Sequence, residues 1–481
     1  MELVTKKAMK CIQEADVIVY DNLIDISLLN YASLNTELIY AGKEAANHYL
    51  SQGSIIELLM DKAREGKYVV RLKGGDPYLF GRGSEEALAL KEAGISYEIV
   101  SGVTSSIAVP AYAGIPVTDR RFASSCHIIT AHREDEAGID FENISKLEGT
   151  LVFMMGLAKL HHIVQGLTLH GKASDTPVAV LSDGSRYNRR KCVGTLADIE
   201  EKVKEARLLP PAIIVVGEVV SLSNELDNFL ERYSDKKLFR KKILLTGTRY
   251  ICHKIKAALA DEGCDIDEIS IIESVPIESD FYNNIEKYIE SHDYLVFSSA
   301  NGIRVFFEKL KELHNVDLRK LSNIKFAVIG KGSAQTLRNY GYIADFIPSS
   351  FSNKDLAVEL CKQLKGEKLL LLRAREASAE LVEELEANKV EYTDVPLYET
   401  FRDYRRTFDI KRLIKNYDYV VVASSITAHT LCEMVEDKAL LEGRVVSIGP
   451  VTTGTCKRLG VEPLMSAREY SVDGIVRVLL Q

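Results

Sequence analysis

Several patterns that mark common protein classes are missing from this chain of 481 residues. None of its eight cysteines forms a CxxC pair, so neither a zinc site nor a disulfide framework is indicated, and reduced thiols are expected. No apolar run is long enough to cross a bilayer, and the N-terminus lacks the basic-then-apolar pattern of a signal peptide. These absences predict a cytoplasmic protein that has no metal site and no membrane partner.

Motifs of several common chemistries are missing as well. No GxxxxGK[ST] or GxGxxG stands between a strand and a helix, which disfavours nucleotide hydrolysis and a classical NAD site. HExxH, a Cys–His zinc set and a Ser–His–Asp nucleophile elbow are also absent. The net charge of −8 argues against nucleic acid as a general partner. An anionic small molecule stays open as a ligand if basic groups cluster locally.

What the sequence does contain predicts an α/β protein of several domains. Its length suggests about three domains, and its 46% hydrophobic and 27% charged residues are typical of globular proteins. Alternating strand and helix patterns up to about residue 105 predict a doubly wound, parallel sheet. We expect a second subdomain from about residue 124 and a charged linker at 233–241. The expected strands are 17–20, 38–40, 69–72, 97–100, 126–130, 150–154, 177–181 and 212–216.

The first subdomain is organised around the stretch VVRLKGGDPYLFGRG at 69–83. A buried strand runs into Gly74 and Gly75, and paired glycines let a ligand approach the backbone closely. The strand ends at Asp21 and at 102–105 belong to the same edge of a parallel sheet, where ligands bind in such folds. A plain turn without a ligand is an equally good local interpretation.

Three charged residues in this region are candidate site residues. Asp21 is a candidate general base, and Lys43 a candidate positive charge beside it. Asp76 is a candidate acceptor for a ligand hydroxyl or amine. Taken alone, both aspartates are also typical helix or turn caps.

A basic cluster follows the expected strand at 177–181. It contains Arg186, Arg189 and Arg190. Such a run is most often a solvated turn, and its use as an anion site needs support from elsewhere.

The last third of the chain contains an internal repeat, which predicts two similar α/β lobes. Three blocks recur in the same order: 242–249 with 368–375, 292–306 with 417–431, and 327–341 with 446–460. Small polar residues follow the strands of both lobes, and we expect them to line a cleft for a polyanion, with helix capping as the alternative. They are Ser298, Ser299, Asn301 and Gly330 in one lobe, and Ser424, Ser425, Gly449 and Thr452 in the other.

Residues 1 to about 232 resemble uroporphyrinogen-III C-methyltransferases of the tetrapyrrole methylase fold. The resemblance rests on VIVYDNLI (17–24), YAGKE (40–44), VVRLKGGDPYLFGRG (69–83), VSGVTSSIAVPAYAGIPVTDR (100–120), FMMG (153–156) and SDGSRYNRR (182–190). It implies Asp21 as base, with Lys43 as its partner, and the three arginines as ligands for the substrate's carboxylates. It implies S-adenosyl-L-methionine contacts at Gly74, Gly75, Asp76, Leu79, Thr104, Ser105, Met155 and Gly184.

Residues from about 242 to 481 resemble uroporphyrinogen-III synthases more loosely. The matching stretches are VFSSANG (296–302), IGKGSAQTL (329–337) and VPLYET (395–400), together with the repeat. The family's tyrosine falls on Tyr398, and the small polar residues become carboxylate ligands. Lobe one is expected at about 242–276 plus 401–481, and lobe two at about 277–400.

Together the two resemblances imply a bifunctional enzyme. Its synthase half would cyclise hydroxymethylbilane to uroporphyrinogen III with inversion of ring D, and its methylase half would add two methyl groups to give precorrin-2. The missing NAD fingerprint implies that the chain stops there, and the methylase fold implies a homodimer. The alternatives are a methylase that acts on a later corrin intermediate, and an inactive methylase scaffold beside an active synthase.

The N-terminus departs from the methylase pattern. Members of that family begin with a strand and a GxGPGD loop directly before the helix that here starts at Glu2. Without a central parallel strand, two strand edges and part of the cofactor pocket would be exposed. We therefore expect an upstream start codon, roughly 15 residues earlier.

Overall fold

A computed structural model describes residues 2–42, 51–131, 138–313, 317–350 and 352–481. The chain divides into two compact units, each described below by itself. The first comprises Met1–Thr246, Tyr250–Ile269 and Arg405–Gln481, and the second comprises Gly247–Arg249 and Ser270–Tyr404.

The first sheet of the first unit is parallel and has the order β2-β1-β3. Its strands are β1 (Val17–Tyr20), β2 (Glu37–Tyr40) and β3 (Val69–Leu72). The strand predicted at 97–100 is wrong: this segment has no strand partner among the described residues, where β3 pairs with β1 alone. A strand needs a neighbour to satisfy its backbone groups, and its sequence does not say whether one is present.

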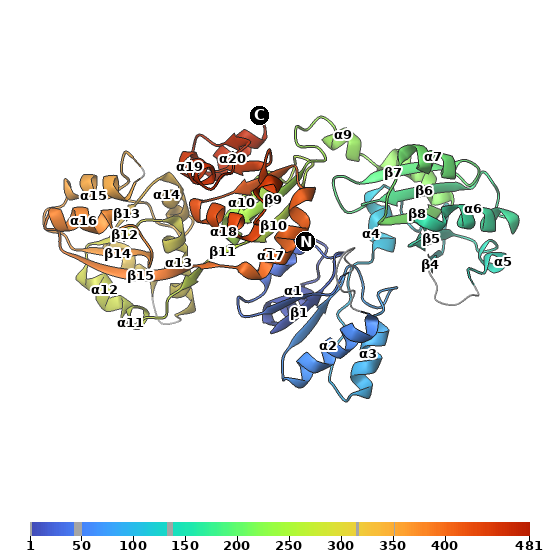
Figure 1. The fold of residues 1–481 in the computed structure, drawn as a ribbon, viewed down its shortest axis with the longest axis horizontal. Coiled ribbons are helices and arrows are strands. Elements are labelled where there is room, and N and C mark those ends of the chain that lie inside the picture. Colours follow the sequence, from blue (N-terminus) through green and yellow to red (C-terminus); the bar gives the residue numbers. More distant parts are fainter. Residues whose placement is uncertain (1, 43–50, 132–137, 314–316, 351) are drawn as a thin grey trace. The chain divides into compact units, whose positions relative to one another are not determined.

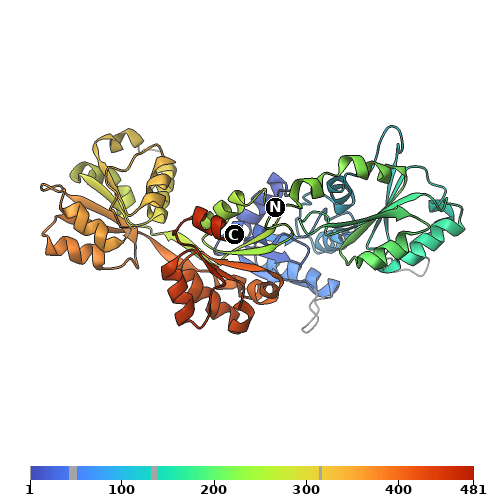
Figure 2. The same ribbon diagram turned by 90° about the horizontal axis from the view of Figure 1, so that it is seen from above.

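The second sheet is mixed and has the order β4-β5-β8-β6-β7. Alternating side chains of these strands enter two separate cores: Leu151 and Phe153 pack with helix α6, whereas Val152 packs with helix α4. Helices therefore cover both faces of this sheet (Figure 2). Its strands are β4 (Cys126–Thr130), β5 (Thr150–Met154), β6 (Pro177–Ser182), β7 (Arg190–Thr195) and β8 (Ala212–Val216).

The third sheet, in the order β10-β9-β16-β17-β18, lies largely in the first unit. Its strands are β9 (Lys242–Gly247), β10 (Asp265–Ser270), β16 (Tyr419–Val422), β17 (Val445–Ser447) and β18 (Met465–Ser466). The stretch at 233–241 leads into it, and Leu238 in this stretch is buried in the same core as Ile243.

The second unit is built on the sheet β11-β15-β14-β12-β13 (Figure 1). One face carries Phe297 and Leu370 against α12 and α13, and the other carries Val296 and Leu371 against α15 and α16. Its strands are β11 (Ile272–Pro276), β12 (Tyr294–Phe297), β13 (Lys325–Val328), β14 (Leu369–Ala374) and β15 (Tyr392–Arg402).

The internal repeat is confirmed by the topology of the last two sheets. Strands β9, β16 and β17 lie parallel and adjacent in one sheet, and β14, β12 and β13 lie parallel and adjacent in the other. These are the strands of the three repeated blocks in the same spatial order. The α/β class and the two-lobed duplication predicted from the sequence are therefore present.

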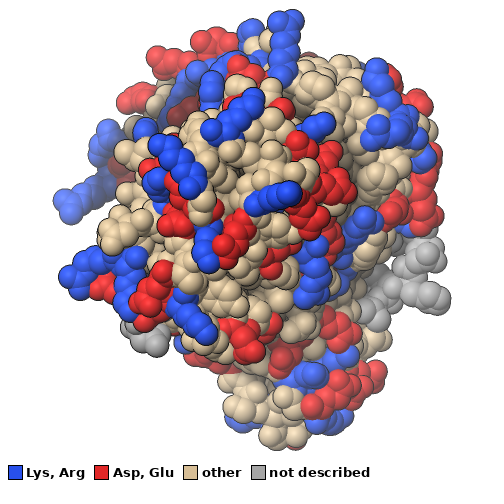
Figure 3. Space-filling view, turned by 90° about the vertical axis from the view of Figure 1, so that its left-hand side faces the viewer, with Lys and Arg blue, Asp and Glu red and all other residues tan. Residues whose placement is uncertain are grey.

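Helices connect the strands of all four sheets. In the first half they are α1 (Lys6–Glu14), η1 (Ile26–Tyr31), α2 (Gln52–Arg64), α3 (Gly83–Glu92), α4 (Ser105–Tyr112), α5 (Phe141–Ile144), α6 (Leu160–Leu169), α7 (Ile199–Ala206), α8 (Ser223–Leu226) and α9 (Phe229–Tyr233). In the second half they are α10 (Arg249–Ala258), α11 (Asp280–Asn283), α12 (Ile285–Ser291), α13 (Ala300–Glu312), α14 (Lys331–Arg338), α15 (Asn353–Cys361), α16 (Glu380–Ala387), α17 (Thr407–Leu413), α18 (Ser425–Val435), α19 (Pro450–Arg458) and α20 (Val472–Leu479). On the face shown in Figure 3, acidic and basic side chains are interspersed.

Candidate functional site

The glycine loop after β3 is shaped by contacts within the protein. A Cβ atom at Gly74 would lie 2.7 Å from the carbonyl oxygen of Leu23, so a larger residue would force the backbone apart. Gly75 has a φ of +79°, a conformation that glycine adopts without strain. A Cβ at Gly75 would meet its nearest neighbours, in Val103 and Thr104, at 3.8 Å, which is an ordinary van der Waals contact.

Asp76 joins this loop to the one that precedes α4. Its carboxylate accepts hydrogen bonds from the backbone N–H of Gly102 at 3.0 Å and of Tyr78 at 2.9 Å. Burial acts to raise the pKa of Asp76, but these N–H donors outweigh it and lower the pKa below its ordinary value of 3.8. The side chain therefore fills the capping role that the sequence left open, and it fixes two loops together.

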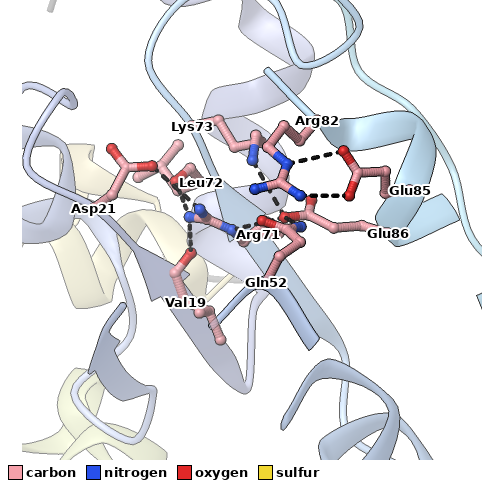
Figure 4. A network of polar contacts seen from close by, with 9 residues as sticks. All are labelled: Val19, Asp21, Gln52, Arg71, Leu72, Lys73, Arg82, Glu85 and Glu86. Carbon is pink, nitrogen blue, oxygen red and sulfur yellow. Dashed lines mark hydrogen bonds and ion pairs between the residues drawn. The ribbon is translucent and has the colours of Figure 1, made fainter. Parts of the chain in front are cut away.

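Asp21 stands at the end of β1 and is oriented from two sides. Its Oδ1 accepts from the backbone N–H of Leu23 at 3.0 Å, and its Oδ2 accepts from Nη2 of Arg71 at 3.2 Å (Figure 4). Arg71 reaches over from β3 and also donates to the carbonyl oxygen of Val19 at 3.3 Å. The guanidinium thus holds the Asp21 carboxylate against the strand that carries it.

A buried glutamate completes this network (Figure 4). Glu86, in the first turn of α3, is 5% exposed, and its Oε1 accepts from Arg71, Lys73 and Gln52 at 3.4, 3.2 and 3.1 Å. Burial lowers the pKa of Lys73, and the charge of Arg71 adds to that effect. Two carboxylates, Asp21 and Glu86, therefore face two cations, so most of the buried charge is compensated.

Arg71 and Glu86 were not predicted as site residues. Arg71 is the single charged residue in an otherwise apolar strand, VVRL, and this was the available signal. Glu86 carries no comparable signal, because acidic residues are common in the first turn of helices.

A cavity of about 2990 Å³ opens beside this network and lies wholly within the first unit. It brings together loops from both sheets of the N-terminal half. The predicted residues that line it are Asp21, Gly74, Gly75, Leu79, Ser105, Met155, Gly184, Arg186 and Arg189. Asp76, Thr104 and Arg190 are not among the lining residues, and Lys43 lies outside the described part of the chain.

Residues from α4 and the second sheet form the opposite side of this cavity. Met155 follows β5 with a φ of +55° and leaves half of its surface exposed. Gly184 packs against Val109 of α4 so closely that a Cβ would collide with it. Thr104 caps α4 by accepting from the N–H of Ser106 at 3.4 Å, which places Ser105 at the cavity wall.

The three arginines of the basic cluster have separate surroundings. The Nη1 atom of Arg186 lies 3.6 Å from a carboxylate oxygen of Asp267 in β10. The guanidinium of Arg189 stacks 3.7 Å from the ring centroid of Phe229. Arg190 begins β7 and donates to carbonyl oxygens at the end of α7. Arg186 and Arg189 are thus placed to meet a ligand in the cavity, and Arg190 is a helix cap.

In the second unit, Tyr398 of β15 is 5% exposed, and its Oη lies 2.8 Å from Oγ of Ser299. Burial raises the pKa of Tyr398, although the Ser299 contact acts to lower it. Ser299 also caps α13, accepting from the N–H of Gly302 at 3.0 Å. A neutral phenol is therefore held at the start of a helix, where it can donate a proton.

The other small polar residues predicted in the synthase-like lobes also lie at helix starts. Ser424 caps α18 by accepting from Thr427 N–H at 3.1 Å, as Ser299 caps α13. Gly330 and Gly449 directly precede α14 and α19. The repeat therefore reproduces its caps as well as its strands.

The remaining predicted residues of these lobes differ in their contacts. Asn301 accepts from Nη2 of Arg304 at 2.5 Å, and Ser425 accepts from the hydroxyl of Thr455 at 3.1 Å. Ser298 is partly buried at the end of β12. The Thr452 hydroxyl is buried and has no hydrogen-bond partner among the residues that the structure describes.

Neither a metal centre nor a membrane-spanning helix is found in the described ranges. They contain no cluster of three or more His, Cys, Asp or Glu side chains that could hold a metal ion. In the same ranges, no helix is both long and apolar enough for a membrane span.

Two family models match different parts of the chain. Residues 1–200 match tetrapyrrole (corrin/porphyrin) methylases, and residues 253–477 match uroporphyrinogen-III synthase HemD. The two resemblances seen in the sequence are thereby confirmed.

Three relatives place these matches in context. A porphyrin biosynthesis protein HemD of Ruminiclostridium josui is 35% identical over 100% of this chain and 95% of its own length. A uroporphyrinogen-III C-methyltransferase of Methanocaldococcus jannaschii is 49% identical over 46% of this chain and 92% of its own. An S-adenosyl-L-methionine-dependent uroporphyrinogen III methyltransferase of Methanosarcina barkeri is 49% identical over 47% and 89%. Because the Ruminiclostridium josui protein aligns over 100% of this chain and 95% of its own length, this chain belongs to the family of that HemD protein. In this chain the tetrapyrrole methylase match precedes the uroporphyrinogen-III synthase match.

Proposed function

We propose that this chain is a bifunctional enzyme of tetrapyrrole synthesis. Its C-terminal half cyclises hydroxymethylbilane to uroporphyrinogen III, and its N-terminal half methylates that product twice to give precorrin-2. The observation that carries the methylase assignment is the convergence of Asp21, the Gly74–Gly75 loop, Met155 and Gly184 on one cavity.

The cavity fits S-adenosyl-L-methionine as the methyl donor. Its volume exceeds the few hundred to 1,000 Å³ that is typical of small-molecule sites, so donor and substrate have room together. Gly75 has no Cβ, so the donor can approach the loop backbone closely, and Leu79 and Met155 supply apolar surface for the rest of the donor. When bound, the donor supplies an electrophilic methyl group.

The protein's own contribution to methylation is alignment and removal of a proton. Asp76 holds the glycine loop in place through its hydrogen bonds with Gly102 and Tyr78, so the loop can keep the bound donor in one position. Alignment of the reacting groups accounts for much of the catalysis of group transfer. Asp21, oriented by Arg71, accepts the pyrrole N–H proton whose loss restores conjugation. Arg186 and Arg189 serve as ligands for the substrate's carboxylates.

In the synthase half, Tyr398 assists departure of the hydroxyl group from hydroxymethylbilane. Its phenol is protonated and held by Ser299, so it can donate to the leaving oxygen. The helix N-termini capped by Ser299 and Ser424 present backbone N–H groups suited to carboxylates.

One assay of the full chain tests both halves. Hydroxymethylbilane and S-adenosyl-L-methionine are supplied together, and the product is followed by absorbance and mass. Addition of two methyl groups supports the proposal. An unmethylated type III porphyrinogen would remove the methylase assignment, and absence of any type III product would remove the synthase assignment.

The methylase resemblance also leads us to propose a homodimer formed through the N-terminal half. Light scattering coupled to size-exclusion chromatography tests this directly. A mass of 53.7 kDa across the working concentration range would refute it.

A further inference from the structure

A buried polar seam joins the two halves of the chain inside the first unit. On the methylase side it contains Tyr20 at the end of β1 and Asn30 in η1; on the synthase side it contains Arg406 and Asp409 around the start of α17. Arg406 is 1% exposed and Asp409 is fully buried. Charges so deeply buried are tolerated when each is paired and hydrogen-bonded.

Arg406 satisfies its charge on both sides of the seam. Its Nε donates to Oδ2 of Asp409 at 3.2 Å, within the synthase half. Its two terminal nitrogens donate across to Oδ1 of Asn30 at 2.8 Å and to the carbonyl oxygen of Ile26 at 3.1 Å. Both acceptors belong to η1. Because all three nitrogens of this buried guanidinium are hydrogen-bonded, Arg406 fixes η1 to the synthase half.

Asp409 fixes strand β1 to the synthase half in the same way. Its Oδ2 accepts from the phenol of Tyr20 at 3.0 Å, and Tyr20 is 2% exposed. A third charge, Arg412, lies 3.4 Å from the other oxygen of Asp409 and also stacks on the ring of Tyr40 in β2. The seam thus holds the ends of two neighbouring strands of the first sheet.

The backbone of β10 adds a second, uncharged set of bonds. Asn30 donates to the carbonyl oxygen of Glu268 at 2.8 Å, and the Glu268 N–H donates to the hydroxyl of Ser27 at 2.9 Å. Asn30 therefore bonds to both Arg406 and Glu268, which links the two attachment points. These contacts explain why η1 buries polar side chains that a helix of an isolated domain would turn to solvent.

Tyr20 is the residue immediately before Asp21. We propose that Asp409, braced by Arg406, is a positioning residue for methylation: through the Tyr20 phenol it fixes the end of β1 and so places the Asp21 carboxylate in the cavity. This inference rests on the proposed function of Asp21 as the proton acceptor. It makes the synthase half part of the support of the methylase centre.

The effect is expected on turnover more than on binding. The donor loop at 74–76 is held by the hydrogen bonds of Asp76 with Tyr78 and Gly102, whereas Asp21 follows Tyr20 directly. A displacement of a catalytic group by about 1 Å is enough to cost a large factor in rate. Loss of the Tyr20 bond should therefore lower kcat and leave the affinity for the donor unchanged.

The test uses the full chain with uroporphyrinogen III supplied, so that methylation does not depend on ring closure. We expect Tyr20→Phe and Asp409→Asn each to lower kcat about 10-fold. The KM for S-adenosyl-L-methionine and the calorimetric affinity for S-adenosylhomocysteine should stay within about two-fold. In the double variant the losses should not multiply, because both changes break one interaction.

Tyr342→Phe serves as the matched control, since it removes a phenol that donates to the carbonyl oxygen of Leu318 at 2.9 Å, far along the chain from β1. It should leave both activities unchanged. Three results would each overturn the positioning role of Asp409. They are methylation by Tyr20→Phe at the wild-type rate, losses of kcat that multiply in the double variant, and a loss of ring closure equal to the loss of methylation. A wild-type chain that does not methylate would overturn the proposed function together with this role.

Discussion

The two halves of the molecule use small residues in the loops before their helices in different ways. In the methylase half, Gly74 and Gly102 are required because the backbone of another segment passes directly beside them. In the synthase half, Ser299 and Ser424 each cap the helix that follows their own strand. The first arrangement depends on residues distant in the sequence, and the second is local.

This difference predicts how well each half tolerates substitution. A loop that is held by contacts from other segments cannot absorb a new side chain without moving its partners as well. A helix cap contributes about 1 kcal/mol, and its loss is confined largely to one helix turn. We therefore expect the methylase site to tolerate substitution less well, and the following variants test that comparison.

The largest effect is expected from Asp21→Asn. The amide keeps an oxygen for the N–H of Leu23 but can no longer accept a proton, so methylation should fall by about 10²- to 10⁴-fold. Ring closure, measured as formation of type III porphyrinogen, should be unchanged. Asp61→Asn, on the exposed surface of α2, is the control for loss of a carboxylate. Methylation by Asp21→Asn at more than a tenth of the wild-type rate would remove Asp21 as the base.

A pair of glycine variants probes the loops directly. A Cβ on Gly102 would collide with the carbonyl oxygen of Gly75, so Gly102→Ala should destabilise the first unit by about 1–3 kcal/mol and weaken binding of S-adenosylhomocysteine. Gly332, in α14, has open space within 4 Å of the position that an alanine methyl group would take, so Gly332→Ala should be neutral or stabilise by up to about 1 kcal/mol. Scanning calorimetry and titration calorimetry measure both. Equal effects of the two substitutions would refute the proposed contrast between the halves.

In the synthase half, Tyr398→Phe should slow ring closure about 10-fold, the value of one productive hydrogen bond of roughly 1.4 kcal/mol. Methylation of supplied uroporphyrinogen III should be unaffected. Tyr392→Phe is the control on the same strand, because its phenol donates to Glu386 at an exposed site. If both variants close the ring at the same rate, Tyr398 has no role in the step.

The sequence predicted what depends on local periodicity and repetition. The bounds of β1, β3, β4, β5 and β8 agree with the structure, as does the repeat. The features that the sequence did not predict correctly depend on which strands pair with each other. The segment 97–100 looks like a strand but has no neighbour to pair with among the described residues, whereas β7 was read as part of a basic turn because Arg190 begins it.

The same limit applies to the site. The cavity residues were found through motifs, but Arg71 and Glu86 became visible when β3 and α3 were placed together. Arg406 belongs to FRDYRRTFD, a run that reads as a solvated surface, yet it is one of the most buried side chains in the chain. Its partners Asn30 and Asp409 are 379 residues apart, and no local pattern reports such a contact.

The smallest expected effect concerns two carboxyl groups with opposite pKa shifts. Asp76 of the methylase half has a lowered pKa because Gly102 and Tyr78 donate to it, although burial opposes this. Such a group stabilises the fold above its unfolded pKa, and this contribution is lost as the pH falls through the folded value. Glu273 of the second unit has a pKa raised by burial, which the nearby Arg249 partly offsets. Its contribution is present at low pH and is lost as the pH rises through the folded value.

Asp76→Asn should therefore destabilise the chain at pH 7, by at most about 1 kcal/mol because the site is partly solvated, and the deficit should shrink below about pH 4. Glu273→Gln should show the reverse trend, with stability at or above the wild type at pH 8 and its least favourable value in acid. Thermal unfolding recorded across this pH range measures both profiles. If the two profiles run parallel, neither carboxyl group is linked to folding in the way that its surroundings imply. If they diverge, the ionised carboxylate of Asp76 stabilises the fold, whereas the ionised carboxylate of Glu273 destabilises it.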